Sequence, residues 1–225
     1  EKSNRIVEIL VATVKPQSLM LGKIIGIGLS AFLQFLLWLF IVSIGLYFMR
    51  ETVFVDIYDA ANVADSANSH AYNQFVELVF ERIQFSSMIS YFLLFFAVGY
   101  LFYGALFAAL GAVTGSESDG QQFLLPLIAL LLFALYSGYY VLNNPESPMA
   151  QFYQYLPFTA PVVVMVKLAM GYPEGQEYQL FVSLLILISS TIIVLLMAGR
   201  LYKNGLLQFG HSVKLRQILQ WIKMK

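Results

Sequence analysis

Residues 1–23 read EKSNRIVEILVATVKPQSLMLGK, and this stretch determines how the rest of the chain is interpreted. Glu1, Arg5 and Glu8 have the spacing of neighbours on one face of a helix, where opposite charges stabilise each other. The apolar residues between and after them form the opposite face. Pro16 cannot continue that helix without losing a hydrogen bond, so we expect it in the first turn of a second helix. The pattern predicts a charged helix, a bend and a second helix that enters a membrane.

The composition is that of a membrane protein. Of the 225 residues, 59% are hydrophobic and 12% charged, whereas soluble domains average about 45–50% apolar and about 25% charged residues. The net charge is zero, but ten of the 13 basic residues lie in 1–23 and 199–225. The chain contains no cysteine, which excludes disulfides and thiolate chemistry. It begins with neither Met nor a signal peptide, so we expect it to be part of a longer protein.

Four long uncharged segments predict transmembrane helices. The first has 26 residues without a charge, about 39 Å as a helix, which exceeds a bilayer core of about 30 Å. The four segments are 24–49, 88–113, 123–142 and 178–197. The sequence thus predicts an all-α membrane protein, with a transmembrane domain over 24–198 between a cytoplasmic segment, 1–23, and a basic amphipathic tail, 199–225.

Small residues recur one helical turn apart in two of these segments. Gly22, Gly26 and Ser30 form one ladder, and Gly104 and Ala108 belong to another. Small residues at this spacing let membrane helices approach closely, so we expect helix packing at both ladders.

Residues 156–170 form a fifth apolar segment that is too short to cross a membrane. Pro157, Pro161 and Gly171 interrupt it or follow it. The two basic ends predict a cytoplasmic location for both, which requires an even number of crossings. We therefore expect a re-entrant or surface hairpin on the outer side.

The region between the first two spans is polar and acidic at its start. Residues 72–84 then alternate apolar and polar positions with helical spacing, which predicts an interfacial amphipathic helix. The carboxylates at the start of this region do not have the spacing of a calcium loop, so we interpret them as part of a solvated loop and not as a cation site.

Several segments, in order, resemble the C-terminal membrane part of type 2 ABC exporter permeases, in the branch that includes sodium- and drug-efflux permeases. Residues 1–23 resemble the coupling segment of that family, with its Pro-containing turn and Gly-Lys pair. Residues 114–122 (TGSESDGQQ) resemble its acidic loop before paired glutamines, and 143–157 (NNPESPMAQFYQYLP) its Asn-Pro-acidic-Ser-Pro loop. The tail repeats the family's closing Arg-x-Tyr pattern at Arg200 and Tyr202.

The resemblance implies a permease subunit that couples a separate ABC ATPase to substrate efflux. ATP and magnesium would be held by that ATPase, with no cofactor in this chain. The permease would form a homodimer or heterodimer in the cytoplasmic (inner) membrane of a bacterium or archaeon, in contact with lipid and not with nucleic acid. The residues that the resemblance assigns to ATPase coupling are Glu1, Lys2, Arg5, Glu8, Pro16, Lys23, Glu117 and Asp119.

The sequence supplies no catalytic or metal-binding pattern. His70 and His211 have no partner at metal-ligand spacing. Hydrolase and phosphate-loop motifs are also missing, so we do not expect an enzyme. Two alternatives to a permease are a membrane scaffold without transport activity, which needs no coupling helix, and an intramembrane hydrolase, which needs a catalytic constellation.

Overall fold

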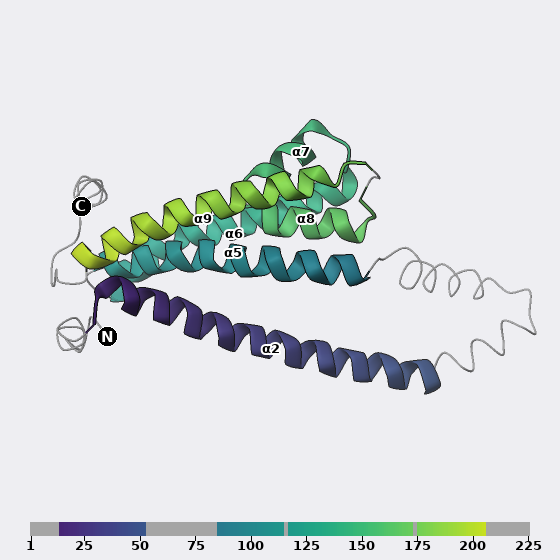
Figure 1. Ribbon diagram of the computed structural model, residues 1–225, viewed down its shortest axis with the longest axis horizontal. Helices are drawn as coiled ribbons and strands as arrows, with labels where there is room; N and C mark the ends of the chain where they lie inside the picture. Colours follow the sequence, from purple (N-terminus) through teal and green to yellow (C-terminus); the bar gives the residue numbers. More distant parts are fainter. Residues whose placement is uncertain (1–13, 53–84, 115–116, 173–174, 206–225) are drawn as a thin grey trace, which may run out of the picture. The chain divides into compact units, whose positions relative to one another are not determined.

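The computed structural model describes residues 14–52, 85–114, 117–172 and 175–205, and these residues are helical with no strand (Figure 1). The predicted all-α class is therefore confirmed. The helices are α2 (Pro16–Thr52), α5 (Phe85–Val113), α6 (Glu117–Asn143), α7 (Pro148–Tyr155), α8 (Ala160–Ala169) and α9 (Tyr178–Gly205).

Four of these helices are long and apolar enough to cross a membrane, as the sequence predicts. The candidate spans are Pro16–Gly45, Met88–Val113, Gly120–Asn143 and Tyr178–Gly205. The first helix begins at Pro16, as expected, because proline has no N–H to lose at the first helical position and its backbone angle already suits a helix.

The chain divides into two compact units. Of the described residues, the second unit contains α2 from Gly26 onward, and this part of the helix is apolar on all sides. Ser30 and Ser43 donate hydrogen bonds to the carbonyl oxygens of Gly26 and Leu39, at 3.1 and 2.8 Å. Both hydroxyl groups are thus satisfied within their own helix.

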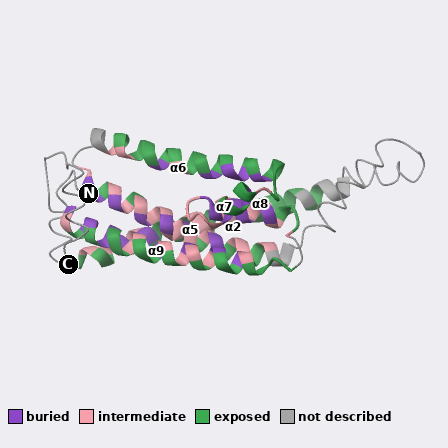
Figure 2. Cartoon of the chain, turned by 90° about the horizontal axis from the view of Figure 1, so that it is seen from above, coloured by how far each residue is buried: buried purple, intermediate pink, exposed green. Residues whose placement is uncertain are grey.

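The first unit contains the start of α2, up to Ile25, together with α5 to α9. One buried cluster joins Met20 and Ile24 of α2 to small residues of α5 and to Ala198, Leu201 and Tyr202 of α9. A second cluster joins α5, α8 and α9 through Phe95, Phe102, Ala160, Val164, Leu180 and Leu187. Figure 2 shows that α6, by contrast, is exposed along most of its length, and Val141 near its end packs with Ala150 of α7 and Val163 of α8.

Helix α8 packs closely against two neighbouring helices at glycines. A Cβ atom at Gly99 of α5 would lie 2.9 Å from Cγ of Pro161, and one at Gly138 of α6 would lie 2.9 Å from Cγ1 of Val162. Real Cβ atoms do not approach so closely, so both contacts require glycine.

The small residues predicted for helix packing occupy different surroundings. A Cβ atom at Gly104 would lie 3.0 Å from Cγ2 of Ile24, and Ala108 packs against the α2–α5–α9 cluster. A Cβ atom at Gly22 would meet no atom within 4 Å. Gly26 and Ser30 belong to the second unit.

The interfacial helix predicted at 72–84 and the tail beyond residue 205 lie outside the described residues.

Replacement of Gly99 by alanine should destabilise the protein. The methyl group would clash with the rigid ring of Pro161, and such overpacking costs about 1–3 kcal/mol, which exceeds the gain of roughly 1 kcal/mol in helix propensity. Gly111→Ala on the same helix is the matched control, because its methyl group would meet no atom within 4 Å. Thermal unfolding in detergent should show a lower midpoint for Gly99→Ala and an equal or higher one for Gly111→Ala. Equal midpoints for both variants would contradict the close approach of α8.

Candidate functional site

A candidate site lies at a helical hairpin made by α7 (Pro148–Tyr155) and α8 (Ala160–Ala169). Ser147 caps α7: its Oγ accepts a hydrogen bond from the backbone N–H of Ala150 at 3.1 Å, and Pro148 follows in the first turn. A serine cap followed by proline is a strong helix start, because the cap satisfies a free N–H and proline has none to satisfy. The Asn-Pro-Glu-Ser-Pro stretch thus ends α6 and begins α7.

The corner between α7 and α8 is held by hydrogen bonds. The Thr159 hydroxyl donates to the carbonyl oxygens of Tyr153 and Leu156, the latter at 3.2 Å. Tyr103 of α5 donates to the carbonyl oxygen of Phe158 at 2.6 Å. These bonds satisfy backbone groups where the chain leaves helical geometry and attach the hairpin to α5.

The three residues predicted to break this segment lie at its turns. Pro157 lies in the corner, and Pro161 lies in the first turn of α8. Gly171 follows α8 with a φ angle of +88°, and Gly175 has +81°. Glycine adopts such angles without the steric cost that a Cβ atom brings, so Gly171 can end the helix.

A polar network centred on Lys167 lies inside the hairpin. The Lys167 ammonium donates to Oε1 of Gln154 at 2.7 Å, and Nε2 of Gln154 donates to the Tyr172 hydroxyl at 2.7 Å. Tyr172 donates to Oε1 of Gln179 at 3.2 Å, and Nε2 of Gln179 donates to Oε1 of Gln176 at 3.1 Å. The chain of hydrogen bonds therefore links α7 and α8 to the start of α9.

The charge on Lys167 fixes the direction of this chain. An ammonium group only donates, so Gln154 must turn its carbonyl oxygen toward it and its NH₂ toward Tyr172. Tyr172 then accepts from Gln154 and has its proton available for Gln179. Aligned hydrogen bonds polarise one another, which strengthens each link.

The lysine end of the network is removed from water. Gln154 is 0% exposed and Lys167 is 9% exposed. Burial lowers the pKa of the Lys167 ammonium below its ordinary value. Burial also raises the pKa of Tyr172, an effect that its hydrogen bond with Gln154 partly offsets. Burial of the Lys167 ammonium therefore costs free energy, and its hydrogen bond to Gln154 offsets part of that cost.

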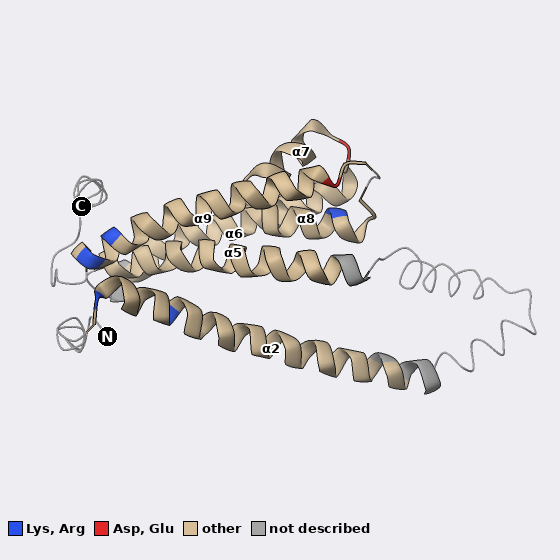
Figure 3. Cartoon of the chain, in the orientation of Figure 1, with Lys and Arg blue, Asp and Glu red and all other residues tan. Residues whose placement is uncertain are grey.

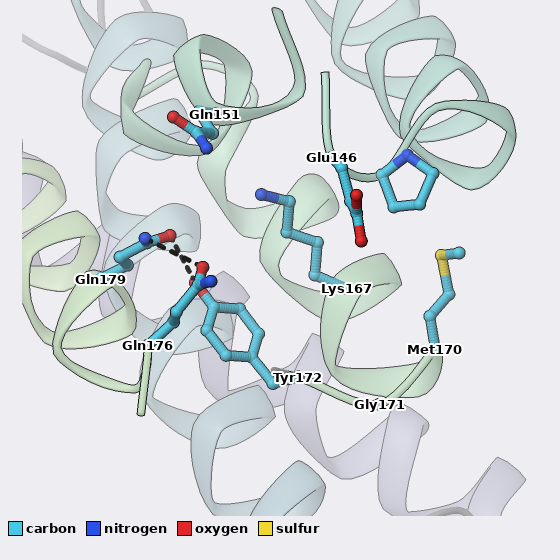
Figure 4. A pocket seen from close by; sticks show the side chains of 9 residues that line it. Glu146, Gln151, Lys167, Met170, Gly171, Tyr172, Gln176 and Gln179 are labelled. Carbon is cyan, nitrogen blue, oxygen red and sulfur yellow. Dashed lines mark hydrogen bonds between the residues drawn. The ribbon is translucent and has the colours of Figure 1, made fainter. Parts of the chain in front are cut away.

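A cavity of about 490 Å³ lies beside this network (Figure 4). Its lining combines polar side chains with two apolar ones from the hairpin and from the segments before and after it. The lining residues are Pro145, Glu146, Gln151, Lys167, Met170, Gly171, Tyr172, Gln176 and Gln179.

Four of the five basic residues that the structure describes in the first unit lie at the other end of the bundle. Lys15 and Lys23 lie near the start of α2, and Arg200 and Lys203 near the end of α9 (Figure 3). In the same region a Cβ atom at Gly199 would lie 3.5 Å from Cγ of Gln17. The first turns of α2 therefore rest directly on the end of α9.

The residues predicted for ATPase coupling are only partly described. Pro16 and Lys23 lie in the first turns of α2. Glu117 and Asp119 lie at the start of α6. The other four, Glu1, Lys2, Arg5 and Glu8, lie outside the described residues.

The network around Lys167 was not predicted from the sequence. A lysine in an apolar segment signals a buried partner, and this signal was present. The other members of the network, Gln154, Tyr172 and Gln179, lie in α7, in the segment after α8 and in α9, and no sequence periodicity connects them. Within the described ranges no group of three or more His, Cys, Asp or Glu residues could hold a metal ion.

Removal of the Gln154 amide should destabilise the hairpin. Gln154→Leu leaves the buried Lys167 ammonium without the acceptor it now uses, and an unsatisfied buried group costs about 1–3 kcal/mol, more when charged. The double variant Gln154→Leu/Lys167→Met removes both partners and should recover most of this loss. The measurement is the thermal unfolding midpoint of all variants in detergent.

Gln151→Leu is the control for this experiment, since Gln151 is exposed on the same helix and lines the same cavity. Exposed substitutions usually change stability by less than about 0.5 kcal/mol. A double variant with the summed loss of its two single variants would show that Gln154 and Lys167 do not stabilise each other.

Comparison with known proteins identifies the family. The family model described as ABC-2 family transporter protein matches residues 1–200. The uncharacterized protein MJ1024 of Methanocaldococcus jannaschii is 26% identical over 227 aligned residues, which cover 100% of this chain and 48% of that protein. The uncharacterized protein YhaP of Bacillus subtilis is 25% identical over 224 residues, with coverages of 100% and 49%. This chain thus spans about half the length of these relatives, and no solved structure matches it.

The family match covers every described helix except the last residues of α9, and it includes the candidate spans on which a membrane transporter depends. The chain therefore belongs to the ABC-2 family of transporter proteins.

Proposed function

We propose that this chain is the permease part of an ATP-driven exporter in which a separate ABC ATPase drives efflux. The observation that carries this proposal is the family match over residues 1–200, combined with four helices able to cross a membrane. In this proposal ATP and magnesium bind to the ATPase, and this chain catalyses no reaction. Two permease chains, identical or different, form the transport pathway in the cytoplasmic membrane of a bacterium or archaeon.

The charge distribution supports one orientation. Lys15, Lys23, Arg200 and Lys203 lie at the end of the bundle opposite the hairpin. Cytoplasmic ends of membrane helices are enriched in Lys and Arg, so we place this end in the cytoplasm. The hairpin of α7 and α8 then lies on the outer side, as a re-entrant or surface element.

Single cysteines at the two ends of α9 test this orientation. The helix has 28 residues, about 42 Å, and Lys203 and Glu177, next to its first residue, are exposed near opposite ends. This chain contains no cysteine, so each substitution introduces one label site into it. In intact cells an impermeant maleimide should label Glu177→Cys and leave Lys203→Cys unlabelled until the cells are lysed. The reverse pattern would invert the proposed topology.

The packing at the start of α2 offers a route for force transmission. Met20 and Ile24 are 2% and 5% exposed, and they pack on α5 and α9 beside residues as small as alanine. Close-packed interiors transmit displacement, because they contain few voids that could absorb it. In the proposal, a motion of the ATPase acts on residues 1–14 and reaches α5 and α9 through these contacts.

Reversal of two charges in the coupling segment should separate ATP hydrolysis from the conformational change. Single exposed ion pairs contribute about 0–1 kcal/mol, so Arg5→Ala alone should have a mild effect. Arg5→Glu/Glu8→Arg places like charges against the partner. We expect ATP hydrolysis by the partner to persist while transport per ATP falls. Where no substrate is available, the readout is the alkylation rate of Tyr178→Cys at the exposed first residue of α9, which ATP with vanadate should change in the parent protein and not in the reversed variant.

A matched control keeps this result interpretable. The reversal Glu177→Lys, at the other end of the bundle, should leave coupling unchanged. If the double reversal lowers the unfolding midpoint but the surviving protein keeps its full coupling ratio, residues 1–14 stabilise the bundle and do not transmit force.

A further inference from the structure

The hairpin holds the Lys167 ammonium group, and only some of the N–H donors of this group are used. An ammonium group has three N–H donors, and Lys167 gives one to Gln154 at 2.7 Å. Among the residues that the structure describes, no carboxylate forms an ion pair with Lys167. A cation that is only 9% exposed is strongly stabilised by an opposite charge within reach of its free donors.

The hydrogen-bond network cannot supply that opposite charge. The residues that follow Lys167 in the network, Gln154, Tyr172 and Gln179, are all neutral. Each hydrogen bond is donated in the direction away from the lysine. The aligned dipoles spread the positive charge toward Gln176, but the total remains one positive charge. The network therefore holds Lys167 in place without neutralising it.

The cavity beside the network has the size and lining of a small-molecule site. Its volume of about 490 Å³ lies within the range of roughly 300–1,000 Å³ that is usual for ligand pockets. Figure 4 shows the Lys167 amine directed into the space between Gln151 and Tyr172. Amide groups of Gln151 and Gln176 add polar groups, while Met170 and Pro145 add an apolar wall.

We propose that this cavity binds an oxyanion, the carboxylate or phosphate group of a small molecule or of a lipid headgroup, on the free donors of Lys167. Ammonium-to-oxyanion hydrogen bonds are among the strongest in proteins, and Lys167 itself is only 9% exposed. This inference does not depend on the proposed transport activity, because it concerns binding alone.

Glu146 gives the proposal a directional test. Its side chain lines the same cavity and is exposed to solvent. A carboxylate there repels an anion bound at Lys167, so its replacement by the neutral Glu146→Gln should tighten anion binding. Lys167→Met should have the opposite effect, because it removes the cation that attracts the anion.

The experiment measures thermal unfolding of the full-length protein in a neutral detergent. Inorganic phosphate replaces chloride at constant ionic strength, and a ligand of the folded state raises the midpoint with a saturable dependence. We expect Lys167→Met to weaken the apparent affinity by about tenfold or more and Glu146→Gln to strengthen it by roughly threefold or more. Lys203→Met and Glu177→Gln, which alter charges outside the cavity, should respond like the parent protein.

An equal response to phosphate in the parent, Lys167→Met and Glu146→Gln proteins would overturn the proposal, because it would be a general salt effect. If Lys167→Met does not fold, Glu146→Gln compared with Glu177→Gln still decides, and an unchanged affinity in both would overturn it. Dihexanoylphosphatidylglycerol in place of phosphate distinguishes the sources. Tighter binding of the lipid supports a headgroup, and tighter binding of free phosphate supports a small molecule.

Discussion

The structure depends on one constraint: inside a bilayer, polar groups must find their partners within the protein. Helices satisfy the backbone, and side-chain hydroxyls follow the same rule by donating to carbonyl oxygens one turn back. Ser189 donates to Leu185 at 2.6 Å, and Thr191 donates to Leu187 at 2.7 Å. In the described part of the chain, no buried side-chain nitrogen or oxygen lacks a hydrogen-bond partner. These two hydroxyl groups are satisfied within their own helix, and the Tyr103 hydroxyl is satisfied by the carbonyl oxygen of Phe158, so a hydroxyl group in a span does not by itself mark a substrate path.

The same constraint explains why the polar residues concentrate at the hairpin. There the backbone leaves helical geometry at the start of α7, at the α7–α8 corner and after α8, and each departure needs a cap or a glycine. Of the six buried polar or charged residues described, four lie in or against this region: Gln154, Thr159, Lys167 and Ser183. Ser183 of α9 donates to the backbone oxygen of Gln154 at 2.6 Å, so the helix that follows the hairpin also holds its central residue. The hairpin is thus specified by polar contacts, whereas the long helices are specified mainly by apolar length.

This difference determines how much the sequence could predict. Each span is an apolar run of membrane-crossing length, a local property, so all four could be predicted without knowledge of the packing. The close contacts of α8 could not, because the neighbours of Gly99 and Gly138, Pro161 and Val162, lie far away in sequence. Regular spacing identified Gly22 as a packing residue on the same grounds as Gly104. Only Gly104 has a close tertiary neighbour, Ile24, because periodicity does not show which face of a helix meets another helix. The Lys167 network could not be predicted either, because its members lie far apart in the sequence and no periodicity relates them.

In the proposed function, this chain is the membrane component of a transporter whose ATPase is a separate subunit. The most direct test is the mass of the intact complex, measured by native mass spectrometry after the tagged full-length protein is isolated from its own membranes in mild detergent. We expect a complex that contains equal numbers of this protein and of a soluble ABC ATPase, and that hydrolyses ATP. The contradictory result is this protein alone, without ATP hydrolysis, from membranes in which other ABC permeases keep their ATPase subunits under the same conditions.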